Sequence, residues 1–235
     1  MIDQKVFFIT GAGSGIGKAT TLSLLAAGAK VFGIGRDPSK LEALKRERPT
    51  PNLATRVCDV SDEASVAEAF ADCAARFGRL DGLLNNAGLG IPTPDLSEAK
   101  LADFEAMFNT NVRGTFLCTR EALRLMKPAK AGHIVNIVSV AGQKTNPTAP
   151  LYCASKFGQR GVGLGLADQA LKLGIRVSEV NPSATDSAYW GDRKVAREKM
   201  LKVEDVASVI LWVFSAPEHM LIRQVDVDSM AWLTQ

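Results

Sequence analysis

Short apolar segments rich in β-branched and aromatic residues alternate along this chain with longer segments of helical character. The expected strands are residues 5–10, 30–35, 53–58, 80–85, 132–139, 175–180 and, at one edge, 224–228. The first expected helix follows the first strand and ends near residue 27. Further helices are expected at 38–48, 62–77 (with Ser61 as its N-cap), 100–126 as one helix or two, 152–173 and 204–214. Strands separated by single helices require right-handed crossovers. This pattern predicts an α/β fold with a doubly wound parallel sheet and helices on both faces.

The 235 residues suffice for one sizeable core, and no repeat or linker interrupts them, so we expect a single domain over residues 1–235. Basic and acidic residues number 28 and 25, and the resulting net charge of +3 gives no indication of a nucleic acid or a membrane surface as partner. No apolar segment is long enough to cross a bilayer, and the N-terminal segment lacks a signal-peptide layout.

The four cysteines form no C-x-x-C pair, and the chain has two histidines. Metal sites built from these residue types are therefore not expected. Free thiols are typical of a reducing compartment, so we expect a cytoplasmic protein.

A glycine-rich segment, T-G-A-G-S-G-I-G at residues 10–17, joins the first expected strand to the first expected helix. A glycine motif alone often marks only a tight turn. This one follows a strand and opens a helix, where backbone N–H groups can bind a pyrophosphate without obstruction by side chains. We therefore predict a dinucleotide site whose contacts include Gly11, Gly13, Ser14, Gly15, Ile16 and Gly17.

The second expected strand ends in I-G-R-D, residues 34–37. An acidic residue here would bind the ribose 2′-OH of NAD(H), whereas an arginine favours the 2′-phosphate of NADP(H). Arg36 can form a bidentate pair with a phosphate, so NADP(H) is the favoured cofactor and NAD(H) the alternative. Asp37 has two interpretations, because it can hold the ribose or cap the following helix.

Further motifs follow in order along the chain. They are Asp59, N-N-A-G at residues 85–88, Asn111 with Gly114, Ser139, Tyr152-x-x-x-Lys156 and Asn181-Pro182. Together with the glycine turn they resemble the short-chain dehydrogenase/reductase family in its single-domain form, and the resemblance covers nearly the whole chain. It implies a Rossmann-like fold and an NAD(P)-dependent oxidoreductase that acts on CH–OH or C=O groups.

Tyr152 and Lys156 lie four residues apart, so they share one face of an expected helix. The pKa of a free phenol is about 10, and a nearby ammonium group would lower it. The resemblance makes Tyr152 the acid/base and has Lys156 also bond the nicotinamide ribose. It has Ser139 stabilise charge on the substrate oxygen and Asn111 hold a water in a proton relay to the lysine. Each residue also has a purely structural alternative. Tyr152 and Lys156 can be a surface pair, Ser139 can cap the end of a strand, and Asn111 can be an asparagine inside a helix.

The same resemblance extends the expected cofactor contacts to later turns. These contacts are Asp59, Val60, Asn86, Ala87, Gly88, Tyr152, Lys156, Pro182, Ser183, Thr185 and Ser187. Asp59 would lie at the adenine ring, with a simple turn residue ahead of Ser61 as the alternative. Ser183 stands where the family usually has glycine, which puts the contacts of its loop in doubt. Ser187 stands where a threonine commonly contacts the nicotinamide carboxamide.

Substrate contacts are expected from residues 140–151 and 185–200. Tyr189 and Trp190 hint at an apolar or ring-containing substrate, although sugars, steroids, hydroxy acids, acyl thioesters and xenobiotic ketones all stay open. The charged run at 192–199 is either a lid over the substrate or a solvated helix face. Small residues in the 152–173 helix would allow close helix packing, and the resemblance implies a homo-oligomer, as a dimer or a homotetramer.

Two other classes compete with a carbonyl reductase or alcohol dehydrogenase. A non-catalytic NAD(P)H-binding regulator could use the same fold. Such a binder would not need the acid/base pair of Tyr152 and Lys156, and a purely structural protein would not need the glycine turn. An enzyme with a small-molecule carbonyl or alcohol substrate is therefore favoured.

Overall fold

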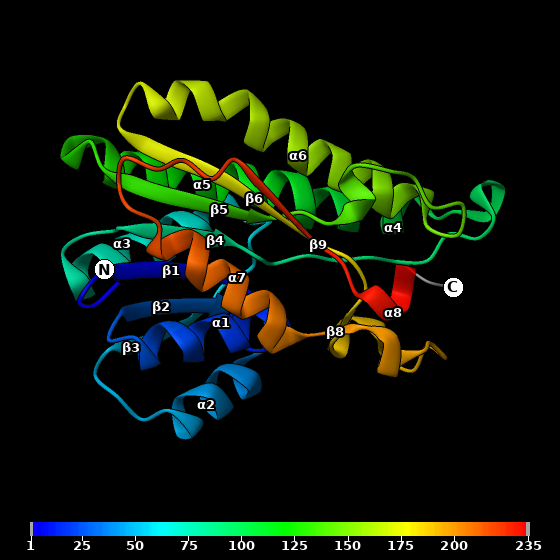
Figure 1. Ribbon diagram of the computed structural model, residues 1–235, viewed down its shortest axis with the longest axis horizontal. Coiled ribbons are helices and arrows are strands. Elements are labelled where there is room, and N and C mark those ends of the chain that lie inside the picture. The colour runs from blue at the N-terminus through cyan, green and yellow to red at the C-terminus, as the bar shows by residue number, and fades with distance from the viewer. Residues whose placement is uncertain (1, 234–235) are drawn as a thin grey trace.

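The computed structural model describes residues 2–233 and contains a seven-stranded sheet in which every neighbouring pair is parallel (Figure 1). The strand order is β3-β2-β1-β4-β5-β6-β9. The strands are β1 (Val6–Thr10), β2 (Lys30–Gly35), β3 (Leu53–Val57), β4 (Gly82–Asn85), β5 (Gly132–Ile137), β6 (Ile175–Pro182) and β9 (Gln224–Val227). This confirms the expected doubly wound, Rossmann-like parallel sheet, with the last strand at its edge.

Helices cover both faces of the sheet (Figure 1). They are α1 (Gly15–Ala26), α2 (Pro38–Glu47), α3 (Glu63–Phe77), α4 (Leu101–Phe108), α5 (Gly114–Met126), α6 (Pro150–Leu171), α7 (Val203–Ser215) and the short α8 (Met230–Leu233). One apolar core lies between the sheet and α3, α5 and α6, and a second lies between the sheet and α1, α2 and α7. In the first core Phe8 is fully buried and stacks on Phe70 at a centroid distance of 3.9 Å.

The strand order reverses between β1 and β4, because the chain first builds β1-β2-β3 outward and then continues on the other side of β1. The connections that leave β1 and β4 therefore run to opposite faces and open a crevice at the carboxyl ends of these strands. In Figure 1 these ends point to the right, where the long loops after β4 and β6 also gather.

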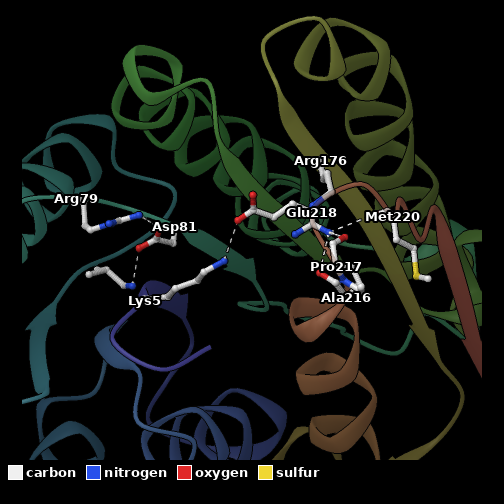
Figure 2. Close-up of polar contacts among 9 residues, drawn as sticks. Lys5, Arg79, Asp81, Arg176, Ala216, Pro217, Glu218 and Met220 are labelled. Carbon is white, nitrogen blue, oxygen red and sulfur yellow. Dashed lines mark hydrogen bonds and ion pairs between the residues drawn. The ribbon is translucent and has the colours of Figure 1, made fainter. Parts of the chain in front are cut away.

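Polar side chains fasten the opposite end of the sheet (Figure 2). Asp81 accepts a hydrogen bond from the backbone N–H of Val6 at 2.8 Å, and Lys5 pairs with Glu218 at 3.4 Å. The Arg176 guanidinium donates to three carbonyl groups just beyond the C-terminus of α7, those of Ala216, Pro217 and Met220. These contacts stabilise the helix end that lies farthest from the crevice.

Two local expectations need correction, and a third that was left open is now defined. The N-cap of α3 is Asp62, which accepts from the N–H of Ser65 at 2.8 Å, whereas Ser61 bonds Asp59. The expected helix at 100–126 is continuous but contains a π-helical turn at Asn109–Arg113 between α4 and α5. The charged run at 192–199 is mostly irregular, with a single 3-10 turn at Arg197–Lys199, because the segment docks through side-chain bonds to carbonyl groups.

Candidate active site

The turn after β1 packs against the turn after β4. Thr10 Oγ1 accepts from the N–H groups of Asn86 and Ala87, both at 2.9 Å, and Asn86 Nδ2 donates to the Thr10 carbonyl at 2.8 Å. A Cβ at Gly17 would lie 2.3 Å from the Gly11 carbonyl oxygen, and Gly11 itself has φ +68°. Glycine is therefore required for this close approach, and the side chain of Ser14 leaves the N-terminus of α1 uncapped.

A cavity of about 520 Å³ opens at this turn. Of the expected cofactor contacts it is lined by Gly11, Gly13, Ser14, Arg36, Asp59, Val60, Ala87 and Gly88. The free N–H groups at the start of a twelve-residue helix face an anion-binding position, and no side chain of the glycine turn fills it. These residues fit the pyrophosphate and the adenosine half of a dinucleotide. Gly15, Ile16, Gly17 and Asn86 shape the turn without lining the cavity.

Asp37 caps α2 through Oδ1 and also lines the cavity, so both of its interpretations fit the structure. Its carboxylate accepts from Ser39 N and Ser39 Oγ at 2.9 and 2.6 Å and so caps α2. The Ser39 hydroxyl holds the pKa of Asp37 below its usual value, so this carboxylate stays charged and engaged in the cap. Arg36 is exposed beside it at the cavity wall, and within residues 2–233 it has no ion-pair or hydrogen-bond partner. Lys40, in the first turn of α2, also lines the cavity and is a cation that the sequence motifs did not single out.

Asp59 holds the turn before α3 and also lies at the cavity. Its Oδ1 accepts from Ser61 N at 2.9 Å and from Ser61 Oγ at 2.8 Å, as a turn residue does. It also lines the cavity together with Val60. The structure therefore places Asp59 at the crevice and uses part of its carboxylate to hold the turn.

Tyr152 lies in the first turn of α6, and Ser139 follows β5, so both stand at the carboxyl edge of the sheet. The ring centroids of Tyr152 and Tyr189 lie 5.8 Å apart, and the hydroxyl groups of Ser139 and Tyr189 both act on the pKa of the Tyr152 phenol. Ser139 also accepts from Ala141 N at 3.1 Å, so it does cap the following 3-10 turn, as the structural alternative expected. The three hydroxyl groups form one cluster beside Lys156.

Lys156 is buried one turn below Tyr152. Its Nζ lies 6.0 Å from the centroid of the Tyr152 ring and donates to the Ile137 carbonyl at 3.0 Å and to Gln159 Oε1 at 2.7 Å. Burial lowers the pKa of Lys156 to about 7. Burial and the neighbouring Tyr189 raise the pKa of Tyr152 above its ordinary value. The expected lowering of the phenol pKa is therefore wrong for this arrangement, because desolvation by burial is the largest influence on the phenol.

Asn111 lies in the π-helical turn and is fully buried. Its Oδ1 accepts from Leu89 N, and its Nδ2 donates to the Leu89 carbonyl and to Ser155 Oγ, each at 2.8 Å. The side chain thus ties the segment after β4 to α6. Such π-helical turns are frequent at functional sites, and this one directs Asn111 toward α6.

Four cofactor contacts were expected at the end of β6 and in the loop after it; three of these residues are buried inside the protein and the fourth lies at the glycine turn. Ser183 donates its backbone N–H to the Val227 carbonyl at 2.9 Å, and Thr185 Oγ1 donates to the Ser183 carbonyl at 3.0 Å. Pro182 accepts from Ser139 Oγ at 3.4 Å. These three residues are buried in structural contacts and do not line the cavity. Ser187 reaches the glycine turn, where a Cβ added at Gly15 would lie 3.5 Å from its side chain.

Two aromatic residues in the connection between β6 and α7, Tyr189 and Trp190, border the site. The Tyr189 hydroxyl lies against Gly90, where an added Cβ would be 1.9 Å from it, so glycine is needed for its approach to Tyr152. The Arg193 guanidinium lies 4.8 Å from the Tyr189 ring centroid and 5.1 Å from that of Trp190. Trp190 Nε1 donates to the Thr185 carbonyl at 2.8 Å. Of these residues, Tyr189 and Trp190 were named from the sequence, whereas Arg193 was included only as part of the charged run at 192–199.

Within residues 2–233, no group of three or more His, Cys, Asp or Glu side chains is placed to hold a metal ion. The four cysteines are free and buried. None of the helices in this part of the chain has the length and apolar character needed to span a membrane.

Comparison with known proteins agrees with this geometry. The model of the short chain dehydrogenase family matches residues 5–198. An uncharacterized oxidoreductase of Staphylococcus saprophyticus is 32% identical over 229 residues, which are 96% of this chain and 97% of the relative.

Three solved structures illustrate the fold. ElxO with NADP bound has 29% identity and a TM-score of 0.88, and the match covers 99% of this chain and 100% of ElxO. The closed form of serine dehydrogenase complexed with NADP+ has 28% identity and a TM-score of 0.86, over 94% of each chain. The 3-ketoacyl-(acyl-carrier-protein) reductase from Brucella melitensis complexed with NADH has 29% identity and a TM-score of 0.92, over 98% and 99%. The chain therefore belongs to the short chain dehydrogenase family and is an NAD(P)-dependent oxidoreductase.

Proposed function

We propose that this enzyme transfers a hydride between NADP(H) and a carbonyl compound or secondary alcohol, with Tyr152 as the acid/base. The observation that carries the proposal is the hydroxyl cluster of Tyr152, Ser139 and Tyr189, which lies above the buried Lys156 at the carboxyl edge of the sheet. In this position one phenol can exchange a proton with a substrate oxygen. The glycine turn and its cavity lie at the same edge.

The bound cofactor supplies or accepts the hydride. In the reductive direction Tyr152 donates its proton to the substrate oxygen, and Ser139 donates a hydrogen bond that stabilises the charge developing there. When Lys156 is protonated, it places a positive charge beside the phenol. Asn111 fixes the backbone that faces the lysine. Oxidation uses the same groups in reverse.

NADP(H) is preferred over NAD(H) in this proposal because of the charges at the end of β2. Arg36 is a free cation at the cavity, and the competing Asp37 carboxylate is engaged in capping α2. Lys40 adds a second cation. NADP is bound in the ElxO and serine dehydrogenase structures, whereas NADH is bound in the Brucella reductase, so the neighbours alone do not select the cofactor.

The direct test follows nicotinamide absorbance against a panel of ketones and secondary alcohols. Tyr152→Phe is expected to lower kcat at least about 100-fold, because general acid–base catalysis contributes 10²–10⁴-fold, while the Kd for NADPH changes little. Cys153→Ser, at the adjacent position, serves as the control. Near-wild-type turnover in Tyr152→Phe would refute the assignment. Tight NADPH binding by the wild-type protein without turnover of any substrate would favour a regulatory binding protein.

We also propose that residues 1–235 act as one domain in a cytoplasmic homo-oligomer, as a dimer or tetramer. Apolar side chains are exposed on α6 at seven-residue spacing, namely Phe157, Leu164 and Leu171. A Cβ added at Gly161 or Gly165 on this helix would meet no atom within 4 Å, so a second helix could approach closely there. Light scattering at assay concentrations tests this, and a strictly monomeric protein would contradict it.

A further inference from the structure

A glutamine with no exposed surface, Gln159, lies directly below the active-site lysine. Its Oε1 accepts from Lys156 Nζ at 2.7 Å, and its Nε2 donates to Thr115 Oγ1 at 3.0 Å. Thr115 Oγ1 donates in turn to the main-chain carbonyl of Asn111 at 2.8 Å. A buried amide lowers stability unless both of its ends are hydrogen-bonded, and both ends of Gln159 are. The position of this polar side chain below the lysine is therefore a specific feature of the site.

The direction of every bond in this network is fixed. The Asn111 carbonyl can only accept, so the single hydroxyl proton of Thr115 is directed toward it. The Thr115 oxygen must then accept from Gln159, which places the amide nitrogen at Thr115 and the amide oxygen at Lys156. The amide therefore has one orientation, with its acceptor on the ammonium group.

The network also leaves the lysine one free donor. An ammonium group has three N–H bonds, and two of them are taken by Gln159 and the Ile137 carbonyl. A Cβ added at Gly88 would lie 3.6 Å from Lys156 Nζ, and Gly88 lines the cofactor cavity. The third N–H is thus available on the side of the cavity and of Tyr152.

No charged side chain within residues 2–233 pairs with this ammonium group. The titratable groups around it are the Tyr152 phenol, the Tyr189 phenol beyond it and the Cys153 thiol next to Tyr152, and burial raises the pKa of both phenols above the ordinary value. Among the side chains that the structure describes, Gln159 Oε1 is therefore the acceptor that stabilises the charged form of Lys156.

We propose that Gln159 is a positioning residue, which holds the Lys156 ammonium group charged and oriented toward Tyr152 and the cofactor cavity. An amide relays no proton here, so Gln159 acts through the lysine alone. The catalytic consequence rests on the function proposed above. The ionisation of the Tyr152–Lys156 pair, in contrast, can be measured without a substrate.

The chain contains two tyrosines, so Tyr189→Phe leaves Tyr152 as the single phenol. The ultraviolet absorbance of this ring responds to the charge beside it and can be followed during a pH titration. Adding Gln159→Met removes the acceptor but keeps the length of the side chain. Loss of a hydrogen bond to a charged group is expected to lower the pKa of Lys156 by about one unit, and this step appears in the Tyr152 absorbance because the lysine lies beside the phenol ring. An unshifted titration in folded Gln159→Met protein would overturn the proposal.

Two threonines provide matched variants. Thr115→Val removes the hydroxyl that orients the amide, and we expect a smaller shift in the same direction. Thr21→Val removes an equivalent buried bond, from Thr21 Oγ1 to the carbonyl of Gly17 four residues earlier, outside this network. It should lower Tm and leave the titration unshifted.

If Gln159→Met does not fold, Thr115→Val decides the question, and its agreement with Thr21→Val would overturn the proposal. The same variants are then compared by the pH profile of kcat/KM, where the limb that reports loss of the Lys156 charge should move to lower pH by the same amount. A wild-type protein that turns over no substrate would refute the proposed function alone, since the titration would still report on Gln159.

Discussion

Replacing Arg36 with alanine tests the choice of cofactor at a single side chain. Arg36 is exposed at the cavity wall, and no carboxylate within residues 2–233 competes for its guanidinium group. A charge-assisted bond contributes about 1.5–3 kcal/mol, and solvent screening at this exposed position favours the lower end of that range. We therefore expect the Kd for NADPH to rise about 10- to 30-fold.

NADH lacks the 2′-phosphate, so its Kd should change by less than about 2-fold in Arg36→Ala. Lys40→Ala is the matched control. Lys40 already faces the Asp37 carboxylate at 3.6 Å, so its loss should weaken NADPH binding by less than about 5-fold.

Binding is measured by titrating nicotinamide fluorescence at low and high salt, and the Arg36 effect should shrink as salt screens the pair. Equal losses for NADPH and NADH would refute the assignment of Arg36 to the 2′-phosphate.

The other predictions concern packing and titration. Phe8→Ala should lower the free energy of unfolding by about 3–5 kcal/mol in urea denaturation, because Phe8 is fully buried against Phe70, and a loss below about 1 kcal/mol would contradict this. Burial lowers the pKa of His133 from 6.5 to about 3, so the unfolded chain binds a proton at a higher pH than the folded protein does. The free energy of unfolding should therefore fall as the pH drops from 6.5 toward 3. Thermal unfolding of His133→Gln should show a weaker pH dependence over that range. Tyr189→Phe removes a hydroxyl that raises the pKa of Tyr152, so the acidic limb of the oxidative kcat/KM profile should move to lower pH, and a shift to higher pH would exclude this role.

The order of the elements and the position of the cofactor turn could be read from the sequence. Local periodicity defines strands and helices, and the crossover rule then leaves few topologies, so the parallel sheet and its edge strand at Gln224–Val227 were predicted. The residues of the glycine turn could be named because the need for close backbone approach leaves glycine as the only choice, as at Gly17. Arg36 was likewise identified from its place at the end of β2.

Other features depend on contacts between segments that are distant in sequence. The π-helical turn at Asn109–Arg113 has no strong local signal, and it is stabilised where Asn111 bonds Leu89 and Ser155. That Asp37 both caps α2 and lines the cavity follows from the position of α2 beside the glycine turn.

The electrostatics of the site were decided by tertiary burial. The four-residue spacing of Tyr152 and Lys156 suggested an ammonium group that lowers the phenol pKa, but sequence spacing carries no information about desolvation. Packing of α6 against β5 and α5 buries the lysine and brings Gln159 and Thr115 to it from positions 3 and 41 residues away along the chain. The sequence thus determined which chemical groups are present and in what order, whereas the folded core decided their charge, because the solvation of an ion depends on every segment that packs around it.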